Sequence, residues 1–181
     1  MHAFDRLSPT EQHALALDGL IWRSGSLHHH LADPPLLPER AEILRRRLPE
    51  WATVAGITAG WLWTGLGRPE PFDLIAPSTP ALSPLVRNQW RPRSPRRNPA
   101  STTRIKGLQV LSRAATASDL LLCRGDDDVV ASQLYQLTEP KSLQEMARAA
   151  LPGRGHARQD RVRQRVSRVR QWWSDYPVVT R

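Results

Sequence analysis

Three consecutive histidines, His28 to His30, are the first residues in the chain whose type suits metal chemistry. On a β-strand His28 and His30 share one face, and Asp33 is close enough in sequence to add an oxygen ligand. A structural zinc site needs four ligands, and the single thiol, Cys123, is far along the chain. A solvated strand face is therefore the better interpretation, and we expect no metal site here.

A second set of residues loosely matches the acid and lysine pattern of metal-dependent nucleases. Such an enzyme gathers carboxylates and a lysine around a metal ion and a water molecule. Asp73 and, much later, Glu139-Pro140-Lys141 supply these residue types. Pro140 cannot donate to a sheet ladder, so the triplet suits the start of a helix better than a core strand. A metal-dependent nuclease is kept as the alternative from the enzyme class.

Two further groups have structural explanations that compete with a functional one. Asp126, Asp127 and Asp128 place acids on the first turn of an expected helix, where the helix dipole favours them, and their spacing does not match a calcium loop. Cys123 follows three leucines, which favours packing over a nucleophilic role. The chain contains no GxGxxG, Walker, GxSxG or HExxH motif. We therefore expect a protein that is not an enzyme and has no cofactor.

The basic residues are gathered in two segments. Within a formal net charge of +9, residues 85–106 hold seven basic residues and no acid, and residues 154–170 hold seven against Asp160 alone. All 26 basic residues except Lys106 and Lys141 are arginines, which codon bias in a GC-rich genome would favour. Codon bias does not explain the clustering. Regional positive charge indicates a surface for an anionic partner, either nucleic acid or an acidic protein, although a plain solvated surface is the competing interpretation.

We assign contact with that partner to arginines of both segments. The first segment contains an arginine- and proline-rich loop at 91–99, and the second forms an arginine-coated helix with one narrow apolar stripe. Such groups neutralise phosphates without reading sequence, and about six neutralised phosphates would give a log–log salt slope of about −5. Trp90 could stack on an unpaired base, although core packing is commoner beside a strand end. The predicted contact residues are Arg87, Arg91, Arg93, Arg96, Arg97, Arg158, Arg161, Arg165 and Arg168.

The elements that must position these side chains predict an α+β fold. We expect a small mixed sheet with packed helices, an N-terminal helix and hairpin, and a C-terminal helical appendage, divided as 1–50, 51–137 and 138–181. Ser8 and Glu11 form a capping box at the start of the first helix. The expected helices are 8–18, 39–48, 58–64, 112–123, 126–137, 142–151 and 156–173. The expected strands are 20–23, 27–31, 51–54, 72–76, 86–90, 102–106 and 108–111.

Bulk composition narrows the setting of the protein. One cysteine excludes an intramolecular disulfide, and residues 1–12 lack the basic and apolar pattern of a signal peptide, so we expect a cytoplasmic protein. Residues 51–67 carry no charge and just reach the length of a membrane span. Their four glycines and central tryptophans are more typical of a segment buried in a core. We expect no membrane partner.

Two stretches of the chain carry a family resemblance. One is ITAGWLWTGL at 57–66, followed by FDLIAP at 72–77, and the other is IKGLQVLSRAATASDL at 105–120. The first stretch resembles a helix followed by an apolar strand that ends in proline. The second resembles a Gly-Leu-x-Val-Thr-Ser run that ends in Asp-Leu. Both patterns are those of the antitoxin-type proteins (AbiEi-like) of abortive-infection AbiE systems, especially the shorter actinobacterial forms. The resemblance covers roughly residues 15–137, with Arg113 where the family usually has proline.

The resemblance implies an antitoxin-like bacterial protein. In that family an N-terminal winged-helix region binds DNA and regulates the operon, and an α/β portion opposes a nucleotidyltransferase toxin. Here the winged helix is shortened to one capped helix and a wing-like hairpin, with no recognition helix between them. We therefore expect a non-enzymatic protein that binds nucleic acid without sequence specificity, an acidic partner such as a nucleotidyltransferase toxin, or both. The alternatives are a metal-dependent nuclease and a purely structural interaction protein.

Overall fold

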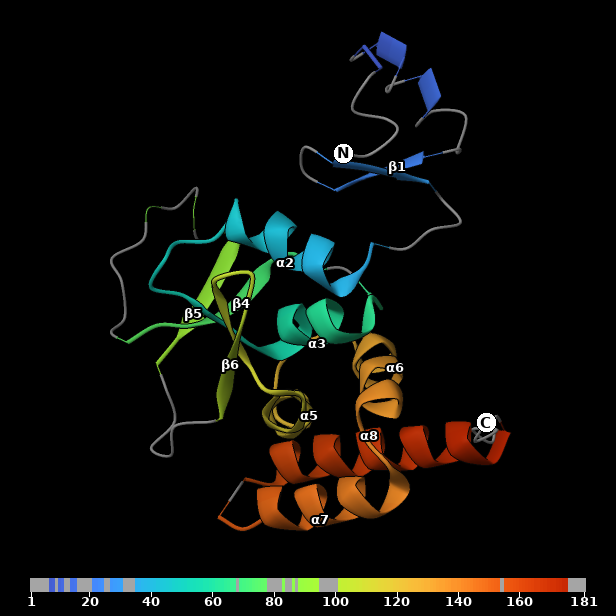
Figure 1. Cartoon of the computed structure of the whole chain (residues 1–181). Coiled ribbons are helices and arrows are strands. Elements are labelled where there is room, and N and C mark those ends of the chain that lie inside the picture. The colour runs from blue at the N-terminus through green and yellow to red at the C-terminus, as the bar shows by residue number, and fades with distance from the viewer. Residues whose placement is uncertain are drawn as a thin grey trace.

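The structure is a computed structural model, and it describes residues 7–8, 10–11, 14–15, 21–24, 27–30, 35–67, 69–77, 83, 86, 88–94, 101–153 and 155–175. Of residues 21–24 and 27–30 it describes the backbone alone. The described residues form six helices, a five-stranded mixed sheet and a separate two-stranded hairpin, which confirms the predicted α+β fold (Figure 1). The hairpin consists of β1 (Ile21–Ser24) and β2 (Leu27–His30) in antiparallel register.

The five-stranded sheet has the order β5-β4-β3-β7-β6. Strand β3 pairs antiparallel with β4 and parallel with β7, while β4 pairs parallel with the edge strand β5 and β7 pairs antiparallel with β6. The strands are β3 (Thr53–Val54), β4 (Phe72–Ile75), β5 (Trp90–Arg93), β6 (Thr102–Ile105) and β7 (Leu108–Leu111). The helices are α2 (Leu37–Arg45), α3 (Gly56–Thr64), α5 (Arg113–Leu120), α6 (Asp127–Leu137), α7 (Pro140–Ala150) and α8 (His156–Asp175).

Helix α3 lies at the centre of the molecule. It contacts β4 and α2 on one side and α5 and α6 on the other, which is why apolar residues occur all around it (Figure 1). Gly60 permits the close approach of α6, because an added Cβ would lie 2.0 Å from Gln133 Oε1. Gln133 is fully buried and its amide donates to the carbonyls of Ile57 and Leu66. The expected burial of residues 51–67 is confirmed. Within the described part of the chain no helix is long and apolar enough to cross a membrane.

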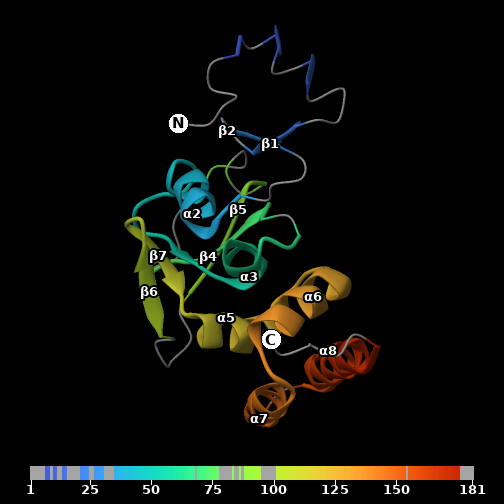
Figure 2. The ribbon, with the colours of Figure 1, turned by 45° about the vertical axis from the view of Figure 1, so that its right-hand side comes forward.

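The buried side chains form two clusters. The first joins α2 and α3 to the sheet, and the second joins α5 and α6 to the pair α7 and α8, which Figure 2 shows at the end of the molecule away from the hairpin. Helix α2 thus packs with the sheet, and α6 packs with the C-terminal helices, across the expected boundaries at residues 50 and 137. The first cluster is Ala41, Ile43, Leu44, Ala52, Val54, Ala59, Trp61, Leu62, Phe72, Leu74, Leu108 and Val110. The second is Ala117, Leu120, Leu121, Val130, Ala131, Leu134, Leu143, Ala147, Val162, Val166 and Val169.

Most predicted elements are present, and helix α7 and strand β5 differ in position. Ser8 and Glu11 form the expected capping box, with Glu11 N donating to Ser8 Oγ and Ser8 N to Glu11 Oε2, while the expected helix end at 18 lies outside the described residues. Helix α7 begins at Pro140 after Glu139, not at Ser142, because proline suits the first turn of a helix. Residues 90–93, rather than 86–90, form β5, since an edge strand tolerates the missing N–H of Pro92.

Candidate anion-binding cleft

Strand β5 presents two arginines on one face because side chains alternate along a strand. Trp90 packs edge-to-face against Trp51, with ring centroids 6.2 Å apart, and belongs to the first hydrophobic cluster. Arg91 and Arg93 therefore face away from Trp90, and both line a cleft beside the sheet. Arg91 is exposed and pairs in register with Asp73 of β4. The predicted loop at 91–99 thus begins as a strand, which fixes the direction of its first two arginines.

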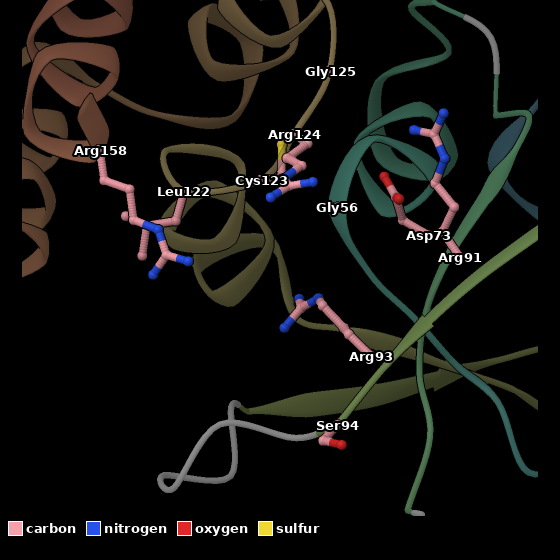
Figure 3. Close-up of a pocket in the computed structure, with 10 residues that line it drawn as sticks. All are labelled: Gly56, Asp73, Arg91, Arg93, Ser94, Leu122, Cys123, Arg124, Gly125 and Arg158. Carbon is pink, nitrogen blue, oxygen red and sulfur yellow. The ribbon is translucent and has the colours of Figure 1, made fainter. Parts of the chain in front are cut away.

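This hollow, the arginine cleft, has a volume of about 1020 Å³. One wall is the β4–β5 edge of the sheet, and the other is formed by the loop between α5 and α6 and by the start of α8. Figure 3 shows Arg93 reaching from the sheet side, Arg158 from the helical side, and Arg124 on the loop beside Cys123. The lining residues are Gly56, Asp73, Arg91, Arg93, Ser94, Leu122, Cys123, Arg124, Gly125 and Arg158.

Arg165 holds the loop that carries Arg124, and the prediction that it contacts a partner is wrong. Its side chain is 0% exposed. The Nη1 atom donates to the carbonyls of Leu120 at 2.6 Å and Cys123 at 3.0 Å, and Nε donates to Asp127 Oδ1 at 2.8 Å. An arginine can be buried in this way because its guanidinium donors meet acceptors and a counter-charge. Arg165 is therefore a structural link between α8, α6 and the end of α5.

Two carboxylates stand at the N-terminus of α3: that of Asp73 lines the cleft, and that of Asp119 lies just behind the lining. Asp119 accepts hydrogen bonds from Gly56 N at 2.9 Å and from Arg93 Nη2 at 2.5 Å, and Asp73 accepts one from Ile57 N at 3.1 Å. These bonds satisfy backbone donors that the first turn of a helix leaves unpaired. Gly56 has a φ of +52°, and an added Cβ would lie 2.6 Å from Asp73 Oδ2. Glycine is therefore required where α3 meets β4.

Burial changes the acid–base properties of two lining residues. The pKa of Asp73 is raised to about 6, chiefly by burial and further by Asp119, while the hydrogen bond from Ile57 N and the charges of Arg91 and Arg93 act in the opposite direction. Burial also raises the pKa of the Cys123 thiol to about 12. Cys123 consequently stays protonated near neutral pH, which does not suit a nucleophile.

Positive charge dominates the cleft. Among the residues that the structure describes, four guanidinium groups line it against one carboxylate, that of Asp73, and the ion pair from Arg93 goes to Asp119 just behind the lining. Arg91, Arg124 and Arg158 are exposed, and none of them forms a salt bridge with any residue that the structure describes. The cleft therefore holds exposed cations without a salt bridge to any described residue, and such cations can bind an anion.

The two basic segments meet in this cleft, but they do so through only some of the predicted residues. Arg91, Arg93 and Arg158 line it together, whereas Arg161 is partly buried and does not line it. Arg168 Nε lies 3.0 Å from Asp128 Oδ1, so the Asp128 carboxylate already supplies a counter-charge to this arginine. Arg87, Arg96 and Arg97 lie outside the described residues. The sequence did not predict Arg124. This residue lies between helix α5 and Asp126, the N-cap of α6, and belongs to neither basic segment.

The structure does not assemble the candidate nuclease residues in one place. Asp73 lines the arginine cleft, whereas Glu139 lines a separate hollow beside α5 and α7. The acids at 126–128 have structural roles, since Asp126 caps α6 and the next two pair with Arg165 and Arg168. No group of three potential metal ligands occurs among the described residues. The side chains of the three histidines at 28–30, and all of Asp33, lie outside them.

Comparison of the chain with protein-family models, with curated proteins and with solved structures gave no match.

Proposed function

We propose that this chain is a non-enzymatic, antitoxin-like protein that binds an anionic partner through the arginine cleft. The observation that carries the proposal is the meeting of two basic segments around one hollow, which brings together Arg93 and Arg158 from positions more than sixty residues apart in sequence. Guanidinium groups gathered in one cleft repel one another, and among the residues that the structure describes Asp73 and Asp119 supply the carboxylates that offset this repulsion. An anion that enters the cleft would relieve the repulsion and gain charge-assisted hydrogen bonds.

The proposed partner is either nucleic acid, bound without sequence preference, or an acidic protein such as a nucleotidyltransferase toxin. A concave cleft can receive a charged group, but it cannot reach into a groove of duplex DNA. This shape supports contact with phosphates over contact with base edges. Trp90 does not line the cleft and packs against Trp51, which supports core packing over base stacking. The resemblance to AbiE antitoxins supports the protein partner.

Binding is tested by fluorescence anisotropy with a labelled single-stranded DNA and, separately, a labelled polyglutamate peptide. We expect the chain to bind at least one of them at low salt, and Arg91→Ala and Arg158→Ala to weaken that binding about tenfold each, since each removes a charge-assisted contact. Arg170→Ala is the matched control, because Arg170 is exposed on the same helix as Arg158 and does not line the cleft. Absence of binding to both probes, or equal losses in all three variants, would overturn the proposal.

The antitoxin part of the proposal has its own test. We place the protein in the cytoplasm of a bacterium, paired with a nucleotidyltransferase that is encoded beside it. Co-expression of the two proteins should then give a complex that survives gel filtration and that Arg91→Ala combined with Arg158→Ala weakens. A gene neighbourhood without such an enzyme would remove the antitoxin assignment and leave anion binding in place.

A further inference from the structure

The arginine cleft has a buried floor and an exposed rim. Gly56 at the floor is fully buried, and Asp73 beside it is partly buried. Arg91, Arg124 and Arg158 are exposed and come from three different elements, namely β5, the loop between α5 and α6, and α8. A ligand group that enters can therefore reach the start of α3, and guanidinium groups of three elements line the cleft that it enters (Figure 3).

This shape favours the end of a charged ligand over the middle of one. A phosphodiester is attached to the strand on both sides, so the strand would have to leave the cleft in two directions. The two free oxygens of a phosphodiester carry a single charge. A phosphate monoester ends at the phosphorus, carries about −1.5 to −2 charge at neutral pH and offers three acceptor oxygens. Arginine forks bind such oxygens bidentately, so several arginines can share one monoester. A carboxylate offers only two oxygens and one charge.

We propose that the arginine cleft binds a terminal phosphate monoester, carried either by a free nucleotide or by the end of a nucleic-acid strand. The inference rests on the proposed function, since it names the anionic group that the cleft receives. Exposed Arg91, Arg124 and Arg158 would contact the phosphate oxygens, while Arg93 stays paired with Asp119. No aromatic ring occurs among the described lining residues, so the phosphate rather than a stacked base supplies the affinity.

Asp73 is compatible with an anion in the cleft because its carboxyl group can be protonated. It faces Arg91 and Arg93 of β5, Asp119 of α5, Ile57 N of α3 and the Cys123 thiol. The pKa of Asp73 is already raised to about 6. A bound dianion disfavours a second negative charge nearby and can therefore keep the proton on Asp73. The protonated group then donates to a phosphate oxygen instead of repelling it.

The test uses three versions of an internally labelled thymidine decamer, with a phosphate at the 5′ end, at the 3′ end or at neither. Anisotropy at about 0.1 M salt keeps long-range charge effects screened. We expect one end-phosphorylated decamer to bind at least tenfold more tightly than the unphosphorylated one, because it gains charge-assisted contacts. That preference should disappear in Arg91→Ala and Arg158→Ala and persist in Arg170→Ala.

Competition with thymidine monophosphate distinguishes the two sources of the phosphate. Inhibition at a concentration similar to the decamer's Kd assigns the site to a free nucleotide, and inhibition only at about a hundredfold higher concentration assigns it to a strand end. Either result supports the monoester.

Three results would count against the inference. Equal binding of all three decamers, still weakened by Arg91→Ala, would overturn it while the proposed function stands. A polyglutamate peptide that binds as tightly as the phosphorylated decamer would overturn it in favour of an acidic protein. Failure of every probe at low salt would overturn the proposed function as well.

The contribution of Asp73 is tested with Asp73→Asn, which keeps an acceptor for Ile57 N and removes the titratable group. We expect this variant to bind the phosphorylated decamer about three- to tenfold more tightly at pH 7.5, since the wild-type protein must first take up a proton on Asp73 at that pH. The gain of the variant over the wild-type protein should shrink as the pH falls below 6. An unchanged affinity at both pH values would show that Asp73 does not face the ligand.

Discussion

The guanidinium group of Arg93 lies 2.5 Å from the carboxylate of Asp119, and this ion pair joins the edge strand β5 to helix α5. Asp119 is only 6% exposed and also accepts the N–H of Gly56 at the start of α3. Three elements that are distant in sequence therefore meet at one carboxylate. Because two of them carry lining residues of the arginine cleft, Asp119 positions that cleft without lining it.

Removal of Asp119 should destabilise the fold. Asp119→Ala leaves the Gly56 N–H and the Arg93 guanidinium without their acceptor, and we expect a loss of about 2–4 kcal/mol. Urea denaturation measures it as a lower midpoint with an unchanged slope. Asp128→Ala is the control, because its carboxylate is 68% exposed and its pair with Arg168 should contribute at most about 1 kcal/mol. Similar losses in the two variants would show that Asp119 has no special structural role.

Arg165 should matter for stability and not for ligand contact. Arg165→Ala leaves the carbonyls of Leu120 and Cys123 and the carboxylate of Asp127 without their donor, so we expect a loss of about 3–5 kcal/mol. Urea titration of Arg165→Ala and of the exposed control Arg163→Ala measures the difference. A loss below about 1 kcal/mol for Arg165→Ala would contradict the buried position of the guanidinium group.

Asp73 should make the stability of the protein depend on pH. The pKa of this carboxyl is about 6 in the fold against 3.8 for the free side chain, so the folded state binds more protons than the unfolded state between these values. Stability from Asp73 is therefore greatest below about pH 4, falls as the pH rises and stays lower above pH 6.

Asp73→Asn removes this dependence. The variant should match the wild-type protein near pH 4 and exceed its free energy of unfolding by about 1–2 kcal/mol at pH 7, a value reduced to allow for the partial exposure of the group. Urea midpoints at pH 4, 5, 6 and 7 provide the comparison. A constant difference between the two proteins across that range would refute the raised pKa.

Nucleic acid should survive incubation with the protein. Asp73 and Glu139 line different hollows, so the residues of the alternative nuclease site do not surround a common metal position. Gel electrophoresis of single-stranded and duplex DNA after incubation with Mg²⁺ or Mn²⁺ should therefore show uncut strands. Cleavage that disappears in Asp73→Ala or Lys141→Ala would instead establish the nuclease.

The sequence predicted the elements better than the contacts between them. The valines at 162, 166 and 169 identified α8 and its buried face, because a helix brings such positions together. Periodicity could not place Arg165, which borders that stripe, since its partner Asp127 is 38 residues away along the chain. Residues 91–93 are predicted as part of a loop because of Pro92, and the position of β5 at the sheet edge explains why a strand forms there.

The candidate site was predicted in part for the same reason. Clustered charge pointed to Arg91, Arg93 and Arg158, which do line one cleft. Charge clustering could not indicate Arg124, because this residue has no basic neighbours in sequence. It also could not separate arginines that serve the fold, such as Arg165, from those that remain exposed. That separation depends on tertiary packing, which residue spacing does not encode.

The salt dependence of binding tests the central claim, that arginines from separate segments form one anion site. The predicted slope is now about −2 for single-stranded DNA, smaller than for six phosphates, because Arg91, Arg124 and Arg158 contact the ligand while Arg93 stays paired with Asp119. Anisotropy titrations at several salt concentrations should give slopes reduced by about 0.7 in each of Arg91→Ala, Arg124→Ala and Arg158→Ala, and an unchanged slope in Arg170→Ala. Equal slopes in all five proteins would contradict the account.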